Sequence, residues 1–159
     1  GKPMGNGHPL AGVVAGAGLV NAFRKDIMYF NTFGGNPVQC AIGMAVLDVI
    51  EQEKLQENSL TTGQYIKDGL LKLKDKHAII GDVRGHGLFI AAELVKDRSS
   101  KEGAVEECTR VVNEMKERGV LLGKIGMYNN ILKMRPPLPF SRDNADQLLS
   151  TLDDVLAAI

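Results

Sequence analysis

The chain has 159 residues, 44% of them hydrophobic and 24% charged, which is an ordinary composition for a globular chain with a core of useful size. Its 19 basic and 19 acidic side chains cancel, and no basic stripe stands out, which argues against nucleic acid as a partner. No apolar run reaches the length of a membrane span, which argues against a membrane partner.

The chain's two cysteines, Cys40 and Cys108, each fall within an apolar pattern of helical spacing. This placement predicts two buried thiols rather than a disulfide, a metal pair or a nucleophile. Free thiols are typical of a reducing compartment, so we expect a cytoplasmic protein.

The first elements in chain order are a short strand, a short helix and a long helix. Residues 10–15 are apolar and rich in valine, which predicts a buried strand, and residues 19–23 suit a short helix. Asn36-Pro37 marks the start of the long helix, because asparagine caps free amides and proline is tolerated at the first helical position. The apolar residues that follow predict one buried face, formed by Val38, Ile42, Val46 and Ile50.

Three further helices are expected downstream. One covers residues 53–76, and its inward-facing side chains are Ile66, Leu70 and Leu73. Another follows a second amphipathic pattern and ends at Gly119, which suits a left-handed cap; its apolar residues are Val105, Cys108, Val112 and Met115. Ser141 should cap the last helix. The apolar stripe of that helix is Leu148, Leu152, Val155 and Ile159.

Four strands are expected between these helices. Residues 78–84 and 88–94 are β-like runs joined through a turn that contains glycine, which predicts an antiparallel pair. Short strands are expected at residues 120–122 and 131–134. The whole order predicts an α/β fold in which a β-β-α-β-β-α portion follows two long helices.

The opening stretch GKPMGNGHPL places Lys2 directly before a run of glycines. The glycines lack the third member and the βαβ context of a dinucleotide-binding loop, and the lysine precedes them, unlike in a Walker loop. Lys2 is then either a solvated surface charge or an amine that bonds an aldehyde cofactor, with glycines that let the backbone approach a flat ring.

Four segments in order resemble the class III pyridoxal-phosphate aminotransferases, enzymes of fold type I: KPMGNGHP, TFGGNPVQCAIGMAVLDVI, VRGHGLFIAAEL and NILKMRPPLPFS. The resemblance covers nearly the whole chain and implies the C-terminal part of such an enzyme. Residues 1–52 would be the end of the large domain that binds pyridoxal 5'-phosphate, with the connecting long helix. Residues 53–159 would be the small C-terminal α/β domain. Because the chain begins at Gly1, inside a functional loop, we expect an excerpt from a longer protein, inactive by itself.

The resemblance also implies roles for Lys2 in the first of these segments and for Thr32 in the second. Lys2 matches the lysine that bonds the cofactor covalently and moves a proton during turnover. Thr32 matches the threonine whose hydroxyl binds the cofactor phosphate of the neighbouring subunit, which implies a homodimer with shared active sites; its alternative is a plain turn residue. The three histidines have no metal spacing, so we expect no metal site: His8, His77 and His86.

The residues expected to bind the substrate depart from the pattern of the family. Many members have an arginine three residues before the Pro-Pro pair, where it holds the substrate carboxylate. Here Lys133 is at that position and Arg135 directly precedes the pair, on the same strand face. Lysine offers a point charge instead of a planar fork, so Lys133 and Arg135 become the candidate substrate-binding residues. Arg84 either orients substrate or cofactor neighbours or forms a hydrogen bond between strands.

This variant resembles the subgroup of alanine–glyoxylate aminotransferase-like proteins and of lyases that act on phosphorylated amines. The resemblance implies transfer of an amino group from an amino acid or ω-amine to a 2-oxo acid. Two alternatives stay open: elimination of phosphate from a phosphorylated amine, and a non-catalytic dimerisation or binding domain. An intact Lys2 loop favours an enzyme.

Overall fold

The computed structural model describes Gly1 and residues 3–159, which separate into two compact units, Gly1–Lys54 and Leu55–Ile159. We call these the N-terminal unit and the C-terminal unit, and each is described by itself. The backbone of Lys54 is left-handed, with φ of 51°, where helix α2 has ended and helix α3 has not begun.

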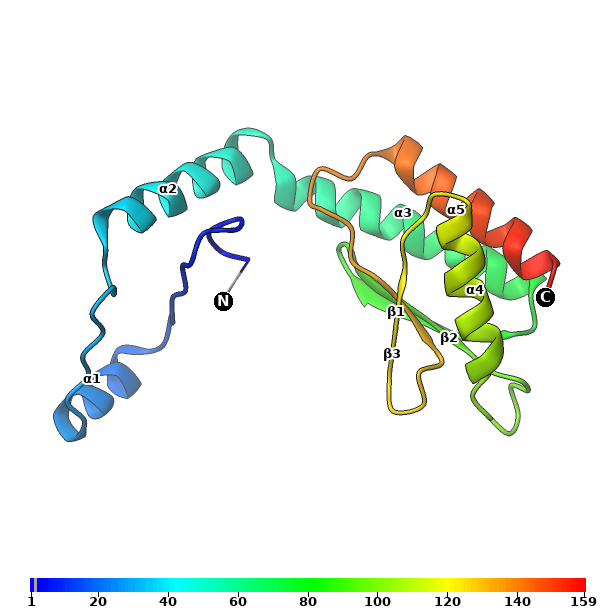
Figure 1. The fold of residues 1–159 in the computed structure, drawn as a ribbon, viewed down its shortest axis with the longest axis horizontal. Helices are drawn as coiled ribbons and strands as arrows, with labels where there is room; N and C mark the ends of the chain where they lie inside the picture. Colours follow the sequence, from blue (N-terminus) through cyan, green and yellow to red (C-terminus); the bar gives the residue numbers. More distant parts are fainter. Residues whose placement is uncertain (2) are drawn as a thin grey trace. The chain divides into compact units, whose positions relative to one another are not determined.

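The N-terminal unit contains two helices, α1 (Ala17–Asp26) and α2 (Pro37–Gln52) (Figure 1). The strand expected at residues 10–15 is wrong: within the described residues these form no ladder, and Val13 and Val14 are 93% and 102% exposed. A strand needs a hydrogen-bonded neighbour, and the described part of this unit supplies only an isolated bridge between Gly5 and His8.

Helix α2 starts where the sequence predicts it. The side chain of Asn36 accepts hydrogen bonds from the Val38 and Gln39 amides at 3.0 and 3.4 Å, and Pro37 is the first helical residue. The predicted buried face is wrong, because Val38 is 63% exposed and the other three apolar residues are only half-buried. Cys40 is exposed rather than buried. The described residues place little over this helix besides Leu10, whose side chain covers Gly43.

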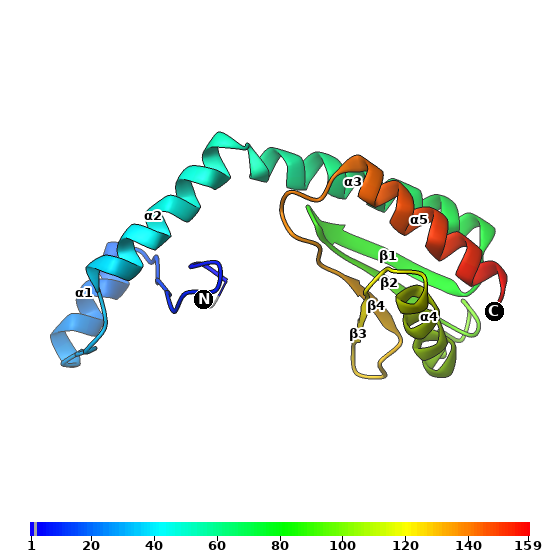
Figure 2. The ribbon, with the colours of Figure 1, turned by 45° about the horizontal axis from the view of Figure 1, so that its top comes forward.

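The C-terminal unit contains a four-stranded antiparallel sheet in the order β1-β2-β4-β3 and three helices (Figures 1 and 2). In chain order its elements are α3 (Leu55–Lys76), β1 (Ile80–His86), β2 (Phe89–Leu94), α4 (Val105–Glu117), β3 (Gly123–Ile125), β4 (Ile131–Met134) and α5 (Arg142–Ala157). This confirms the predicted order of elements and the antiparallel pairing of the first two strands.

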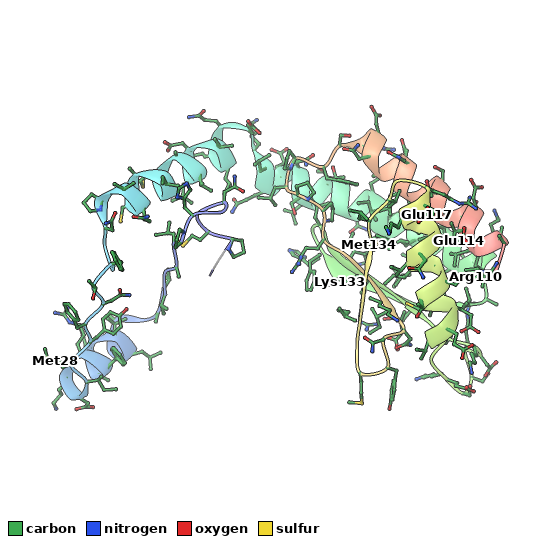
Figure 3. The ribbon with its side chains drawn as sticks, viewed as in Figure 1. Met28, Arg110, Glu114, Glu117, Lys133 and Met134 are labelled. Atoms are coloured by element: carbon green, nitrogen blue, oxygen red, sulfur yellow. The ribbon has the colours of Figure 1, made fainter. Side chains whose placement is uncertain are left out.

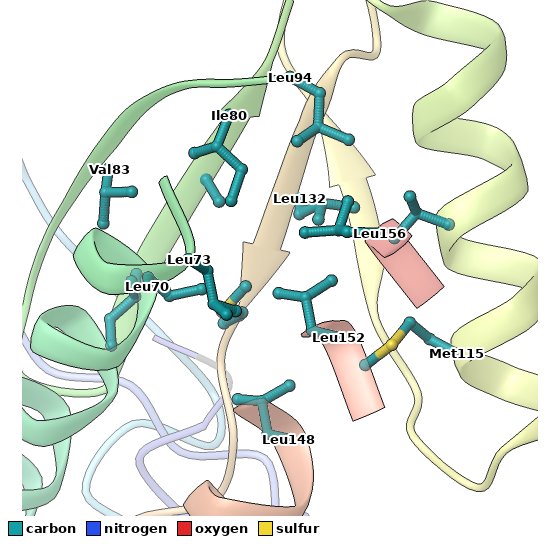
Figure 4. Close-up of a cluster of buried hydrophobic side chains, with 14 of the residues drawn as sticks. Leu70, Leu73, Ile80, Val83, Leu94, Met115, Leu132, Leu148, Leu152 and Leu156 are labelled. Carbon is teal, nitrogen blue, oxygen red and sulfur yellow. The ribbon is translucent and has the colours of Figure 1, made fainter. Parts of the chain in front are cut away.

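The core of the C-terminal unit is formed between one face of the sheet and the three helices (Figure 4). The predicted inward residues of α3 are all buried, and Leu148, Leu152 and Val155 of α5 are buried with them. Ile159 was expected in the same stripe but follows the end of α5 and is 38% exposed. No helix of this unit covers the opposite face of the sheet, so the polar residues on that face are exposed or half-buried.

Strand β3 begins three residues later than residues 120–122, where it was predicted. The reason is the cap of α4: Gly119 is left-handed, with φ of 83°, and the Val120 amide donates to the Met115 carbonyl oxygen at 2.8 Å. This cap occupies the amide of the first predicted strand residue, so pairing with β4 begins only at Gly123.

Candidate functional site

The opening loop is a series of tight turns. Lys2 lies outside the described residues. Beyond it, the amide of Asn6 donates to the Pro3 carbonyl at 3.0 Å and that of His8 to the Gly5 carbonyl at 3.1 Å. Gly5 admits no side chain, because a Cβ there would lie 2.4 Å from the His8 carbonyl oxygen. The glycine-rich sequence therefore makes a compact loop directly after Lys2.

Thr32 lies in an exposed turn between α1 and α2. The turn is closed by Asn31, whose side-chain oxygen accepts from the amides of Phe33 and Gly34, both at 3.1 Å. The two amides that follow Thr32 are therefore already engaged. Among the described residues, the Thr32 hydroxyl has no hydrogen-bond partner and faces solvent, so it is available as a donor to an oxygen of a ligand.

Lys133 and Arg135 lie at the end of β4. Lys133 is half-buried between two buried neighbours, Leu132 and Met134, so its side chain leaves the sheet on the face opposite the core (Figure 3 labels Lys133 and Met134). Arg135 follows β4 and is exposed. Within the described residues, neither cation has an ion-pair partner.

Both cations line one groove of about 600 Å³, a volume that suits a small ligand. Its walls are the segment 119–123, the segment 133–137 and the first turns of α5. No acidic side chain belongs to the described lining, in which Lys133 and Arg135 are the charged residues.

The side chain of Lys133 lies over Gly123. The two residues are direct partners in the β3–β4 ladder, and a Cβ on Gly123 would lie 3.4 Å from Cε and 4.0 Å from Nζ of Lys133. The lysine chain therefore lies over a position that has no side chain. Sequence reasoning missed Gly123, because only the strand register reveals that a glycine stands opposite the lysine.

Arg84 of β1 forms hydrogen bonds to two carboxylates. Its Nη1 donates to Asp82 at 2.6 Å and to Glu93 of β2 at 2.8 Å. These two bonds, that to Asp82 first, raise the pKa of Arg84 above its ordinary value. Of the two roles left open for Arg84, the described residues show the hydrogen bond between strands.

The surroundings of Cys108 and His77 suit a structural role for both side chains. Burial raises the pKa of the Cys108 thiol to about 11, which suits the predicted inert, buried cysteine. His77 is hydrogen-bonded to Asp153 at 2.6 Å. In the part of the chain that the structure describes, no group of three or more His, Cys, Asp or Glu side chains is placed to hold a metal ion.

The candidate residues thus fall on both units. Lys133 and Arg135 of the C-terminal unit share one groove, and Thr32 belongs to the N-terminal unit. Among the described helices, none has the length and apolar character that a bilayer span requires.

Comparison with known families gives a match over nearly all of the chain. The model of the family described as class III aminotransferase matches residues 1–156. The alanine–glyoxylate aminotransferase 2 homolog 2, mitochondrial, of Arabidopsis thaliana is 49% identical over 152 residues, which are 96% of this chain and 32% of that protein. The ethanolamine-phosphate phospho-lyase homolog 1 of Caenorhabditis elegans is 41% identical over 157 residues, which are 98% of this chain and 34% of that protein.

Solved structures agree with these sequence matches. A phospholyase from Arthrobacter in complex with phosphoethanolamine has a TM-score of 0.94 and 43% identity, and the match covers all of this chain and 38% of that one. A Bacillus anthracis aminotransferase has a TM-score of 0.77 and 37% identity, and the match covers 84% of this chain and 31% of the aminotransferase chain. The fold is therefore that of the fold type I transferases, and the chain spans about a third of the length of these relatives.

Proposed function

The chain belongs to the class III aminotransferases, and from this premise we propose that it is the C-terminal part of a pyridoxal-phosphate-dependent aminotransferase. The complete protein would transfer an amino group from an amino acid or ω-amine to a 2-oxo acid. The observation that carries the proposal on the substrate side is the groove whose described lining has Lys133 and Arg135 as its charged residues. We assign residues 1–52 to the end of the large domain and residues 53–159 to the small domain.

Two residues of the N-terminal unit would hold pyridoxal 5'-phosphate. The donor set fits the group: Lys2 supplies an amine for its aldehyde, and the exposed Thr32 hydroxyl supplies a donor for a phosphate oxygen. When bound, this cofactor supplies the electron sink that stabilises negative charge on the substrate carbon. Thr32 would serve the cofactor of the neighbouring subunit, so the enzyme would be a homodimer with shared active sites.

Lys2 would also act as the general base. After the substrate amine has replaced it, its Nζ would take the proton from the substrate carbon that bears the amino group and return a proton in the next step. The compact loop of Gly5 and its neighbours would keep the amine within reach of that carbon. A Lys2→Ala variant should lose nearly all turnover, since no other lysine lies in this loop.

Lys133 and Arg135 would bind the anionic end of the substrate. Two cations without an ion-pair partner among the described residues, in a groove with no acidic lining, favour a negatively charged group. Lys133→Gln should therefore raise the KM for an anionic amine more than it lowers kcat, because the charge acts on binding rather than on the reacting carbon.

A second candidate function is the elimination of phosphate from a phosphorylated amine. Lys133 favours it, because a point charge suits a phosphate group that has no planar carboxylate to match an arginine fork. Two similar proteins named above are phospholyases, one of them bound to phosphoethanolamine.

One experiment separates these functions. The complete protein, loaded with pyridoxal 5'-phosphate, is given L-alanine with a 2-oxo acid and, separately, phosphoethanolamine. Amino transfer without phosphate release supports the aminotransferase, and phosphate release supports the lyase. Loss of both reactions, together with no visible absorbance from lysine-bound cofactor, would favour a non-catalytic domain. The 159-residue chain alone should be inactive.

The compartment of the complete protein stays a prediction. Both cysteines are free thiols, which suits the cytoplasm that we propose. Two similar proteins, from Arabidopsis thaliana and Pongo abelii, carry the word mitochondrial in their names. Fractionation of cells that produce the complete protein decides between these two locations.

A further inference from the structure

The open face of the sheet carries a network of three charges. Arg84 lies between Asp82 and Glu93 and bonds both, at 2.6 and 2.8 Å. Asp82 and Glu93 are direct partners in the β1–β2 ladder, so two like charges stand opposite each other with the guanidinium between them.

Lys133 is a close neighbour of this network. The ladder pairs Arg84 with Ala91 and Ala91 with Lys133, which places the arginine and the lysine in one row across three strands. Glu93 is two residues beyond Ala91 on β2, so it is a diagonal neighbour of Lys133. Diagonal neighbours lie about 7–8 Å apart, within reach of long side chains. A Glu93–Lys133 ion pair is therefore the natural arrangement on this face.

The described residues show a different arrangement. The Glu93 carboxylate is turned to Arg84 on β1, and the Lys133 chain lies over Gly123 on β3, on the other side of β4. Lys133 is in no ion pair or hydrogen bond among the residues that the structure describes. The two groups that attract each other are thus directed to opposite edges of the sheet.

We propose that Arg84 is a positioning residue that sets substrate affinity: it holds Glu93 away from Lys133 and so keeps the lysine charge free for the anionic group of the substrate. This inference rests on the proposed function, in which Lys133 binds that group. Arg84 acts through Glu93 and does not itself touch substrate. Its second effect, to neutralise the facing pair of Asp82 and Glu93, is structural and has to be separated in the test.

The test uses the complete, cofactor-loaded enzyme and its Arg84→Gln, Glu93→Gln and doubly substituted forms. Arg84→Gln frees Glu93, and the KM for the amine substrate that the enzyme turns over, L-alanine or phosphoethanolamine, should rise about fivefold, the size of a half-exposed ion pair. The double variant should return to the wild-type KM, because Lys133 then has no competing carboxylate. Arg84→Lys, which keeps the charge, should lie between wild type and Arg84→Gln.

A matched control is Lys96→Gln, which removes an exposed, paired cation elsewhere in the unit, and its KM should equal that of wild type. A KM of Arg84→Gln equal to that of wild type overturns the proposal. The proposal is also overturned if the KM rises in Arg84→Gln and stays equally high in the double variant. A lower melting temperature without a change in KM assigns Arg84 the structural role alone, which also overturns it.

The failure of the proposed function is recognised separately. If the wild-type enzyme turns over no amine, or if Lys133→Gln leaves KM unchanged, the proposed substrate role of Lys133 is wrong. The positioning part of the inference, that Arg84 holds Glu93 away from Lys133, is then still decided by crystal structures of wild type and Arg84→Gln. Glu93 turned toward Lys133 only in the variant supports the positioning role, and an unmoved Glu93 contradicts it.

Discussion

Asp153 joins the end of α3 to α5 through two short bonds. Its carboxylate accepts from Nζ of Lys76 at 2.7 Å and is hydrogen-bonded to Nε2 of His77 at 2.6 Å. The bond from Lys76, followed by that from His77, lowers the pKa of Asp153 below its ordinary value. A carboxyl whose pKa is lower in the folded state favours folding wherever it is ionised.

We expect Asp153→Asn to lower the stability of the chain at neutral pH but to have little effect in acid. The contribution of Asp153 is fully present above the ordinary carboxyl pKa of about 4 and is lost as the pH falls through the lower pKa of the folded state. Urea unfolding of wild type and variant between pH 7 and pH 2 measures this difference. Asp154→Asn on the exposed neighbour is the control, and a pH-independent difference would contradict the assignment.

At the scale of the element, α5 starts with a capping box. The Ser141 hydroxyl accepts from the Asn144 amide at 3.2 Å, and the Asn144 side chain accepts from the Ser141 amide at 3.2 Å. Two free amides of the helix start are thus satisfied in reciprocal fashion, and the predicted cap at Ser141 is confirmed.

Ser141→Ala should lower the free energy of unfolding by about 1 kcal/mol, the usual cost of a lost cap. Ser150→Ala, on the same helix and away from its start, should have a much smaller effect, since its hydroxyl only bonds the Gln147 carbonyl within the helix. Equal losses of stability in the two variants, measured by thermal or urea unfolding, would be inconsistent with the cap.

The packing of α3 on the β1–β2 turn depends on Gly63. A Cβ at this buried glycine would lie 2.1 Å from the carbonyl oxygen of Gly87, which is backbone of the turn. Gly69 of the same helix is also crowded, but its Cβ would meet the end of the Leu149 side chain, at 2.3 Å. A side-chain end can change its rotamer, whereas the turn backbone has to move.

Gly63→Ala should therefore destabilise the chain by about 1–3 kcal/mol through overpacking. Gly69→Ala should be close to neutral, because alanine is favoured over glycine within a helix by about 1 kcal/mol, which offsets the shift of Leu149. Parallel unfolding curves of the two variants measure the difference. A Gly63→Ala variant as stable as Gly69→Ala would show that the turn gives way easily.

At the scale of the whole molecule, the two units differ in how much of their own apolar surface they bury. Every residue of the described hydrophobic core belongs to the C-terminal unit. In the described part of the N-terminal unit only Gly5 and Gly43 are buried, while large apolar side chains such as Phe30 and Met28 are 79% and 96% exposed.

Hydrogen exchange should separate the two units. In the 159-residue chain, amides of α3, β2, β4 and α5 should exchange slowly, and those of α1 and α2 should exchange fast, because burial of apolar surface controls local opening. In the complete protein the N-terminal amides should become protected. Equal protection of both units in the isolated chain would contradict this prediction.

Local patterns in the sequence determined most of the elements. Asn36-Pro37, Ser141 and Gly119 mark helix ends through bonds to amides or carbonyls a few residues away, so the sequence alone predicts them. The helical spacing of Leu70 and its neighbours predicts the core face of α3 for the same local reason. The order of four motifs also predicts the family, which the comparison over residues 1–156 confirms.

Contacts between distant residues decided the rest. The buried strand at residues 10–15 and the buried Cys40 were wrong, because burial depends on what covers a segment and not on its own apolar character. The proposed roles of Lys2, Thr32, Lys133 and Arg135 stay predictions. Only the register of the sheet places Gly123 under Lys133 and Glu93 beside Arg84, since ladders pair residues that lie far apart in the chain.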